Sequence, residues 1–407
     1  MKVLVTGGAG YVGSHTALEL MRAGHEVVVF DNFLRGRRAA TDALSEVARA
    51  EHDRPDGITV IEGDLTNYDA IEDALRSDAF DAVMHFAGVA FVSESMRDPG
   101  LYYTVNTAGG LNLLNAMKAT RCRRLIMSST CAVYGVPTEL PIAEDAARAP
   151  VNPYGESKLC FETMMSSWAD AYGFKTLALR YFNAAGCEAG GRLGELRNPE
   201  TRLIPSVLRV AAGLERAAMV FGGDLDTRDG SCERDYIHVE DLARVHKLAL
   251  ERLDGLPVRA LNVGTGQGRT VLEVIEAARA VTGKPIPVIH APRRVGDPPA
   301  LVASPERAEE LLGFRAEKSL EDMISSTWEF MQKHLDQLTK RPKRFGEAAV
   351  ELGLVRAEQI DAALAEQKRR DDAGEAHELL GLLMVEMDLI DHRGMIQVLR
   401  KMNPRAE

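Results

Sequence analysis

The sequence predicts an α/β protein with three parts: a doubly wound parallel sheet, a smaller α/β lobe, and an all-helical module at the C-terminus. Three observations lead to this prediction. Short apolar runs alternate with amphipathic segments through the first half of the chain, which is typical of parallel strands joined by helices. A glycine-rich turn follows the first apolar run. Beyond residue 337 the chain contains only short helical patterns, and these repeat.

The expected strands of the sheet are mostly apolar or β-branched. They are Val3–Thr6, Glu26–Asp31, Ile58–Glu62, Ala82–Ala87, Arg124–Ser128 and Thr176–Tyr181, with later strands at Leu261–Val263 and Pro287–His290. Helices are expected at Ser14–Ala23, Ala108–Ala119, Tyr154–Ala169, Leu203–Ala212 and Ser319–His334. Residues 187–235 are rich in Gly, Asp and Arg and are expected to be loops apart from the one apolar helix, as in a lobe built over a pocket.

The predicted organisation has three divisions. Residues 1–337 form the main unit, in which a nucleotide-binding part covers about 1–182 with 235–265 and a substrate lobe covers about 183–234 and 266–337. A polar, basic linker containing Pro342 follows at 338–344. Residues 345–407 form a small helical module in which one motif recurs after 35 residues, as expected for two copies of one supersecondary unit.

Composition excludes several classes of protein. The 407 residues are 45% hydrophobic and carry a net charge of -11, which argues against nucleic acid as a general partner. No apolar run is long enough to span a membrane, and the N-terminus does not have the pattern of a signal peptide. The five cysteines are scattered without metal-site spacing, so we expect reduced thiols, no bound metal and a cytoplasmic location.

The segment Thr6–Gly13 lies between the first strand and the first helix. Its glycines Gly7, Gly10 and Gly13 allow a tight turn and let the backbone approach a pyrophosphate, whose charge meets the helix N-terminus. Asp31 ends the next strand, where a carboxylate binds the ribose hydroxyls of NAD and repels the extra phosphate of NADP. These features predict a Rossmann-type site for NAD. The later Asp64 could meet the adenine or belong to an ordinary strand-ending turn.

Tyr154 and Lys158 stand four residues apart in an expected helix, so the ammonium would lie beside the phenol. A tyrosine titrates near pH ~10, and an adjacent cation lowers that pKa and lets the phenolate act as a base. The run Ser128-Ser129-Thr130 places hydroxyl groups at the end of a strand, where open α/β sheets bind their ligands. Such pairs and runs also occur on ordinary helices and turns, so a catalytic site requires that they lie together.

Over residues 1 to about 335, the chain resembles the extended short-chain dehydrogenase/reductase superfamily and, within it, the UDP-galactose (UDP-glucose) 4-epimerase family. The resemblance rests on an ordered series of motifs. They are Val5–His15, Glu62–Asp64, His85–Gly88, Val133–Gly135, Pro153–Lys158, Leu179–Asn183, Arg234–Val239 and Gly296–Pro298.

The resemblance implies roles for the matching positions. Tyr154 would be the catalytic base, Lys158 its partner and a ribose ligand, and Thr130 the hydroxyl that binds the 4-oxygen of the sugar. The cofactor-binding set would be Gly7, Gly10, Tyr11, Val12, Gly13, Asp31, Asn32, Asp64, Leu65, Phe86, Ala87, Asn106, Ser128, Lys158 and Tyr181. The substrate-binding set would be Thr130, Asn183, Arg202, Leu203, Phe221, Arg234, Arg294, Asp297 and Leu301.

Three positions depart from the family's usual pattern. Ala90 replaces a lysine that often contacts the nicotinamide ribose, and Arg202 stands where the family usually has Asn or His beside the uridine. Leu301 occupies the position tied to sugar size, and its middling volume leaves acceptance of N-acetylated sugars open. His85 and His238 lie in apolar, strand-like runs, and we interpret both as hydrogen-bonded core residues without a catalytic role.

These motifs together predict an isomerase that uses NAD to invert C4 of a UDP-hexose, interconverting UDP-glucose and UDP-galactose through a 4-keto intermediate. Tyr154 would take the proton of the 4-hydroxyl while hydride leaves C4. The ketose, held by its diphosphate, would then turn over and accept hydride on its other face. The resemblance also implies a homodimer formed through the helices at 108–119 and 154–169.

The alternatives are a UDP-N-acetylglucosamine 4-epimerase or another UDP-sugar-modifying enzyme of the superfamily. Dehydratases and decarboxylases need a carboxylic acid near Thr130, and none occurs between Arg124 and Tyr134. An NAD sensor without catalysis is disfavoured because Thr130, Tyr154 and Lys158 are all present.

The C-terminal module resembles the N-terminal domains of type II secretion and pilus-assembly ATPases, some of which bind cyclic di-GMP with two copies of a motif. The first copy here runs from Arg344 through Gly353 to Gln367. The second has Leu379, Asp388 and Met402 in place of the Arg, Gly and Gln. We therefore expect a docking or stabilising module, with weak cyclic di-GMP sensing as the alternative.

Overall fold

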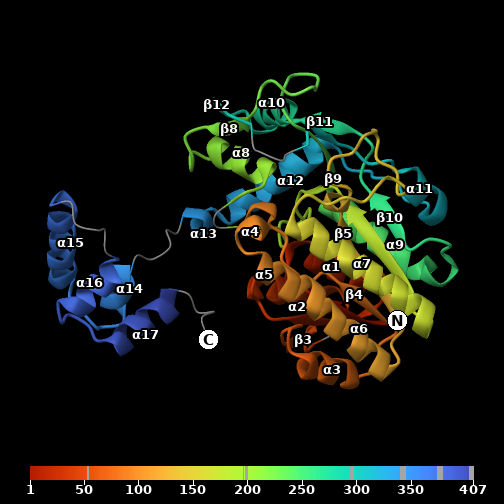
Figure 1. Cartoon of the computed structure of the whole chain (residues 1–407), viewed down its shortest axis with the longest axis horizontal. Coiled ribbons are helices and arrows are strands. Elements are labelled where there is room, and N and C mark those ends of the chain that lie inside the picture. The colour runs from red at the N-terminus through yellow and green to blue at the C-terminus, as the bar shows by residue number, and fades with distance from the viewer. Residues whose placement is uncertain are drawn as a thin grey trace. The chain divides into compact units, whose positions relative to one another are not determined.

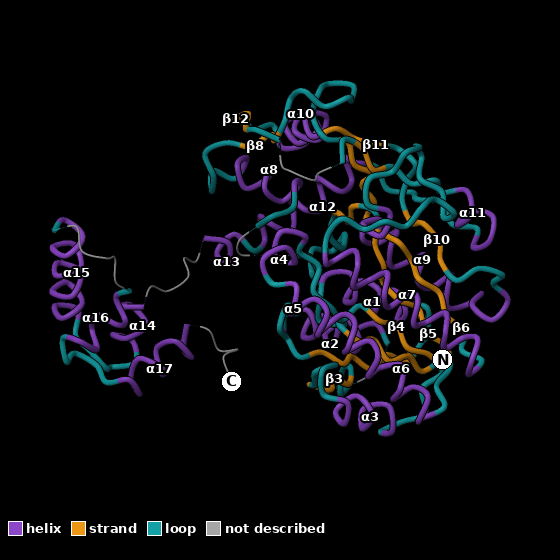
Figure 2. The backbone as a smooth tube through the Cα atoms, viewed as in Figure 1, coloured by secondary structure: helices purple, strands orange, loops and turns teal. Residues whose placement is uncertain are grey.

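The computed structural model describes residues 1–52, 55–195, 197, 200–293, 298–339, 345–373 and 379–402. Its largest sheet has seven parallel strands in the order β10-β6-β5-β4-β1-β2-β3, which confirms the predicted doubly wound fold (Figures 1 and 2). These strands are β1 (Lys2–Thr6), β2 (Glu26–Asp31), β3 (Thr59–Glu62), β4 (Ala82–His85), β5 (Arg124–Thr130), β6 (Lys175–Tyr181) and β10 (Ala260–Val263).

Helices cover both faces of this sheet, because its strands carry buried side chains on both sides. On one face α1, α2 and α9 pack on residues such as Val3 and Val5. On the other face α3, α6 and α7 pack on residues such as Leu4 and Leu125. The helical segments of this part are α1 (Tyr11–Arg22), α2 (Arg38–Glu51), α3 (Tyr68–Arg76), α4 (Val92–Arg97), α5 (Pro99–Tyr102), the π-helix η1 (Tyr103–Ala108), α6 (Gly109–Thr120), η2 (Cys131–Tyr134), α7 (Pro153–Tyr172), α9 (Val239–Arg252) and η3 (Leu253–Gly255).

The strand order reverses between β1 and β4, since β2 and β3 lie on one side of this pair and β5 and β6 on the other. Ligands of open α/β sheets bind in the crevice at such a reversal, outside the carboxyl ends of the strands. The segments that follow β1 and β4 meet there: the Phe86 amide donates to the Thr6 carbonyl at 2.8 Å. The fold therefore places the glycine turn at the expected ligand crevice.

The smaller lobe is built around β9, which pairs with β7, β11 and β13, and around a second small sheet of β8 and β12. Its elements are β7 (Asn183–Ala185), α8 (Leu203–Ala211), β8 (Ala218–Phe221), β9 (Glu233–His238), β11 (Gly268–Thr270), α10 (Val271–Thr282), β12 (Val288–Ala291), β13 (Ala300–Leu301), α11 (Glu306–Leu312) and α12 (Leu320–Lys333). The prediction of loops alone around α8 is wrong, because β8 and the start of β9 fall within 187–235. Short strands like these depend on partners that are distant in the sequence.

Leu335–Glu407 forms a second compact unit, separate from Met1–His334. Its helices are α13 (Leu335–Thr339), α14 (Phe345–Glu351), α15 (Ala357–Asp372), α16 (Leu380–Glu386) and α17 (His392–Met402). The pairs α14–α15 and α16–α17 are the two copies of the repeat. Gly353 and Asp388 occupy equivalent turns with φ of +68° and +54°. Val355 and Ile390, which follow at equivalent positions, are both buried in the core of this unit.

No helix in the described part of the chain is long and apolar enough to cross a membrane. Within the same described residues, no group of three or more His, Cys, Asp or Glu side chains is arranged to hold a metal ion.

Candidate active site

The glycine turn between β1 and α1 brings two stretches of backbone into direct contact. Gly7 has φ +72°, and a Cβ added to it would lie 2.4 Å from the Ala87 nitrogen. A Cβ on Gly13 would lie 2.3 Å from the Gly7 oxygen. Helix α1 begins directly after the turn, and its N-cap residue Gly10 offers no side chain to the first amides. The turn therefore presents a helix N-terminus to an anion such as a pyrophosphate.

Asp31 lies beside this turn at the end of β2. Its carboxylate is buried and accepts hydrogen bonds from the Ala9 amide at 2.9 Å and the Phe33 amide at 2.8 Å. A Cβ on Gly36 would lie 2.9 Å from both carboxylate oxygens, so Gly36 keeps the space next to them open. The arrangement fits the ribose end of NAD, because a fixed carboxylate accepts from hydroxyl groups and repels a phosphate.

Asn32 and Asp64 meet at the carboxyl ends of β2 and β3, where the Asn32 amide donates to Asp64 Oδ2 at 2.6 Å. The Thr66 amide and hydroxyl donate to Asp64 Oδ1 at 2.8 and 2.7 Å. Burial raises the pKa of Asp64, but these hydrogen bonds outweigh it and hold the pKa below its usual range. The Leu65 side chain is buried in the core, and its carbonyl accepts from the Asn112 amide of α6 at 2.9 Å.

The remaining cofactor residues predicted on the β4 side also lie around the crevice. The Phe86 ring packs against the His246 ring, with centroids 4.8 Å apart. Asn106 is buried in the π-helix η1, and its amide group accepts from the Val89 nitrogen at 2.9 Å and donates to the Val89 oxygen and Ser157 Oγ, each at 3.0 Å. Asn106 thus ties the segment after β4 to α7.

Helix α7 carries Tyr154 and Lys158 on one face. The helix begins within one residue of its predicted start at Tyr154, because Asn152 caps it by accepting from the Gly155 amide at 2.9 Å. Lys158 is buried, and its ammonium donates to the Ser128 carbonyl at 3.2 Å. Burial lowers the pKa of Lys158 to about 8, and the nearby Glu162 acts in the opposite direction. Lys158 is therefore mostly charged at neutral pH.

The predicted lowering of the Tyr154 pKa is not found. Burial raises the pKa of Tyr154. A hydrogen bond with Thr130 and the charges of Arg202 and Arg197 act to lower it, but they do not outweigh the loss of solvent. The prediction was wrong because it weighed a neighbouring charge and left out desolvation. The Lys158 ammonium is also committed to a backbone carbonyl.

The hydroxyl groups at the end of β5 lie beside these two residues. Thr130 is buried, caps the η2 turn by accepting from the Ala132 amide at 3.1 Å, and bonds to Tyr154. Ser128 bonds to Tyr181 on the neighbouring strand β6, and the Tyr181 hydroxyl also contacts His246 Nε2 at 2.6 Å. The structure thus brings the three predicted catalytic residues and these two predicted cofactor residues together.

The predicted substrate residues come from several elements of the smaller lobe. Asn183 lies on β7 opposite Tyr236 of β9, and Phe221 ends β8. Arg234 and Leu301 are register partners on β9 and β13, and the Arg234 guanidinium donates to the Glu233 carbonyl at 2.8 Å. Arg294 and Asp297 lie outside the described residues.

Arg202 and Leu203 form the junction at the start of α8. The Arg202 guanidinium lies 4.8 Å from the centre of the Tyr11 ring and 3.0 Å from Glu195 Oε2. It also donates to the Ala184 carbonyl at 3.3 Å. Arg202 therefore connects the smaller lobe to the first residue of α1.

Sequence reasoning missed three residues near this site. Arg197 lies over the Phe91 ring at 4.4 Å, and the Tyr102 ring meets the Tyr154 ring edge-on at 6.2 Å. No local pattern marks either contact. Glu162 is different, because it follows Lys158 by four residues and this spacing could have identified it.

The two histidines have the structural role expected of them. His85 is buried and lies 2.8 Å from Thr6 Oγ1, and burial together with the charge of Lys158 lowers its pKa to about 3. His238 caps α9 by accepting from the Glu240 amide at 3.1 Å and contacts Ser326 Oγ at 3.1 Å. Both rings are neutral at physiological pH, since burial also lowers the pKa of His238 to about 4.

A glycine turn at the strand reversal, a carboxylate ending β2 and a Tyr–Lys pair beside β5 define a dinucleotide-dependent enzyme of the short-chain dehydrogenase/reductase type. The sequence profile described as "NAD dependent epimerase/dehydratase family" matches residues 3–264. The chain belongs to this family, and its cofactor is NAD.

Similar proteins agree with this assignment. The UDP-glucose 4-epimerase of Lacticaseibacillus casei is 41% identical over 350 residues, which cover 85% of this chain and 99% of that protein. The structure of UDP-glucose 4-epimerase from Brucella ovis in complex with NAD has a TM-score of 0.75 and 43% identity, covering 81% of this chain and 97% of that one. The Bifidobacterium longum enzyme in complex with NAD+ and UDP has a TM-score of 0.77 and 38% identity, covering 83% and 99%.

Proposed function

We propose that this protein is a UDP-glucose 4-epimerase, which inverts C4 of UDP-glucose and UDP-galactose. The observation that carries the proposal is the group formed by Thr130, Tyr154 and Lys158 at the end of β5, next to the glycine turn. The names of the similar proteins supply the substrate class. The smaller lobe supports a nucleotide-sugar substrate because it carries the guanidinium groups of Arg202, which lies over the Tyr11 ring, and Arg234 on β9. Guanidinium groups bind diphosphates well.

The mechanism assigns one task to each residue. Tyr154 exchanges a proton with the 4-hydroxyl, Thr130 bonds to the same oxygen and to the phenol, and Lys158 supplies the local positive charge. The glycine turn and Asp31 would hold NAD, which would supply the hydride acceptor and donor for C4. The phenolate must form inside a buried site, so Arg202 and Arg197 aid Tyr154 by opposing the effect of burial on its pKa. The sugar turns over between the two transfers, which requires a loose hexose site beside a firm UDP site.

Replacing Tyr154 with Phe tests this assignment, because the change removes only the hydroxyl. We expect Tyr154→Phe to lose C4 inversion of UDP-galactose while the protein still retains NAD. Tyr172→Phe is the matched control, since Tyr172 is an exposed residue near the end of the same helix and should leave the rate unchanged. Inversion at close to the wild-type rate in Tyr154→Phe would refute the assignment.

The alternative substrate pair is UDP-N-acetylglucosamine and UDP-N-acetylgalactosamine. Leu301 has a half-buried side chain on β13 beside Arg234. We propose that this side chain limits the space for a group on C2 and so decides between the pairs. We expect the unmodified hexoses to react faster. Comparing kcat/KM for the two pairs tests this expectation, and a higher value for the N-acetylated pair would favour the alternative.

We also propose that the enzyme is a homodimer formed through α6 and α7. Leu111 on α6 is an exposed apolar side chain that such a contact would cover. Light scattering after gel filtration measures the mass directly, and the mass of a single chain would contradict the proposal.

For the C-terminal unit we propose docking to a protein partner. In the described part of this unit seven large apolar side chains are exposed: Val350, Leu352, Leu364, Leu379, Leu382, Ile396 and Leu399. Cyclic di-GMP sensing is less favoured because the second copy of the motif has lost its characteristic residues. Calorimetry on the full chain with cyclic di-GMP separates the two roles, since heat that saturates at micromolar nucleotide would favour sensing.

A further inference from the structure

Helix α7 carries a second charged side chain, Glu162, on the face of Tyr154 and Lys158. Glu162 follows Lys158 by one turn, and its side chain is 6% exposed. A carboxylate that has lost its water needs several hydrogen bonds to remain charged inside a protein. The partners of Glu162 therefore indicate what the group does.

Glu162 is held by two other elements of the large sheet. The Arg180 guanidinium, from β6, donates to Glu162 Oε1 at 3.1 Å and Oε2 at 2.7 Å. The Ser129 hydroxyl, from β5, donates to Oε1 at 2.5 Å. These contacts join α7 to the strand that carries the catalytic hydroxyl groups.

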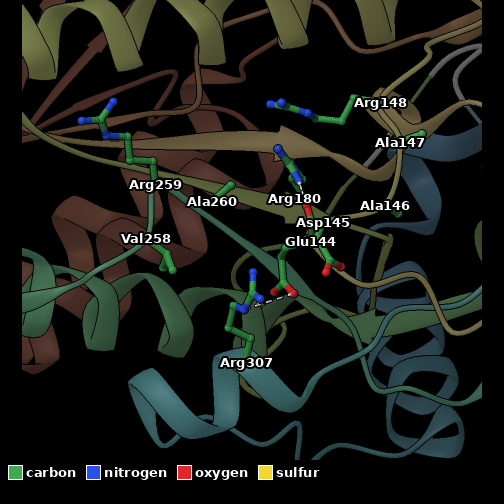
Figure 3. A pocket seen from close by; sticks show the side chains of 10 residues that line it. All are labelled: Glu144, Asp145, Ala146, Ala147, Arg148, Arg180, Val258, Arg259, Ala260 and Arg307. Atoms are coloured by element: carbon green, nitrogen blue, oxygen red, sulfur yellow. Dashed lines mark hydrogen bonds and ion pairs between the residues drawn. The ribbon is translucent and has the colours of Figure 1, made fainter.

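Arg180 is fixed from its other side. It donates to the Tyr134 hydroxyl at 2.7 Å, and that hydroxyl donates to Asn262 Oδ1 at 2.7 Å. Arg180 also lines a cavity of about 450 Å³ together with Glu144 and Arg307 (Figure 3). The guanidinium keeps its bidentate bond to Glu162 although it borders this cavity, so the position of Glu162 is firmly set.

The Glu162 network touches the active site at two points. Ser129 lies between Ser128, whose carbonyl accepts from Lys158 at 3.2 Å, and Thr130, which bonds to Tyr154. The second point is electrostatic, because the negative charge of Glu162 favours the charged form of Lys158. From β4, His85 also faces Lys158, but its ring is neutral at physiological pH.

We infer that Glu162 is a positioning residue for the reaction: fixed by Arg180, it keeps the Lys158 ammonium charged and holds the Ser128–Thr130 strand end against α7. This inference rests on the proposed epimerase function. The buried Glu162–Arg180 ion pair thereby has a role in positioning. A buried ion pair by itself is weak evidence that the pair stabilises the fold.

Replacing Glu162 with Gln removes the charge and keeps the shape. The active form of Lys158 is the charged one, which is present below its pKa and is lost as the pH rises through it. Since Glu162 raises that pKa, Glu162→Gln should lower it. The decrease of kcat at high pH, which is the high-pH limb of the pH–rate profile, should then begin at a lower pH. The rate above the limb should fall about tenfold for each pH unit of this shift, while KM changes little. The pH at which NAD is lost should move in the same direction, which gives a readout besides turnover.

A double variant separates this role from a purely structural one. Glu162→Gln with Arg180→Met removes both buried charges, so it should recover thermal stability lost in the single variant. The high-pH limb should nevertheless stay at the lower pH. Recovery of the wild-type pH profile in the double variant would overturn the inference, as would an unshifted profile in Glu162→Gln.

Glu156→Gln is the control for general effects of charge on α7, because Glu156 is exposed on the same helix, and it should leave the profile unchanged. The wild-type protein separates this inference from the proposed function. Absence of C4 inversion in the wild type contradicts the epimerase proposal, while inversion with an unshifted limb in Glu162→Gln contradicts only the role of Glu162.

Discussion

Two glycines with similar positive φ values distinguish the effect of backbone strain from the effect of limited space. Gly7 has φ +72° and lies against the backbone of Ala87, while Gly24 has φ +83° with no atom within 4 Å of an added Cβ. Gly24→Ala should cost only the backbone strain, about 1 kcal/mol. Gly7→Ala must also move the segment after β4, so it should cost more and should abolish NAD retention.

Thermal unfolding and the absorbance of bound NAD measure the two effects for both variants. Equal losses of stability in Gly7→Ala and Gly24→Ala, with NAD retained in both, would show that the contact between the turn and Ala87 is unimportant.

At this scale the sequence predicts which residue types carry the chemistry, and it does not predict their energetics. Tyr154 and Lys158 are identified by their spacing. The direction in which the pKa of Tyr154 shifts depends on burial, and spacing gives no information about burial. Asp31 is identified by its place after a strand. The Glu162–Arg180 pair joins a helix to a strand, and neither residue belongs to a pattern that would pair it with the other.

At the scale of elements, the large sheet is predictable because its parallel strands are continuous apolar runs buried on both faces. Most of the expected strand boundaries in this sheet fall within two residues of those observed. Strand β5 extends two residues beyond its expected end, to Thr130, whose hydroxyl is one of the proposed catalytic groups. The strands of the smaller lobe are less predictable. β8 is four residues long and pairs with β12, about seventy residues later, so its sequence alone carries little information.

The repeat in the C-terminal unit gives a prediction about one turn. Asp388 holds φ +54° at the position where the first copy has Gly353 at +68°. A side chain is strained in this conformation, so Asp388→Gly should stabilise the unit by about 0.5–1 kcal/mol. Gly353→Ala is the matched control and should destabilise it by a similar amount. Chemical unfolding followed in the full chain measures both, and a destabilised Asp388→Gly would show that the Asp388 side chain compensates for its strain.

At the scale of the whole molecule, the chain consists of two units with separate cores. The two cores of the large sheet contain residues up to Phe314, and the core of the last helices contains only residues from Phe345 onward. A chain ending at residue 337 should therefore fold and retain kcat, KM and bound NAD, because the proposed catalytic and cofactor residues all precede that point. Loss of folding or of NAD in the shortened chain would show that the last helices belong to the enzyme unit. Melting curves of the full and the shortened chain, together with an activity assay of both, measure these outcomes.

The division at His334 also sets an order of events during synthesis. Domains fold as units while the chain is made at about 5–20 residues per second. The enzyme unit can therefore close its sheet and take up its cofactor seconds before the last helices leave the ribosome. The repeat unit then assembles after the enzyme unit is complete, so errors in its own folding have little opportunity to trap the slower parallel sheet in an incorrect state.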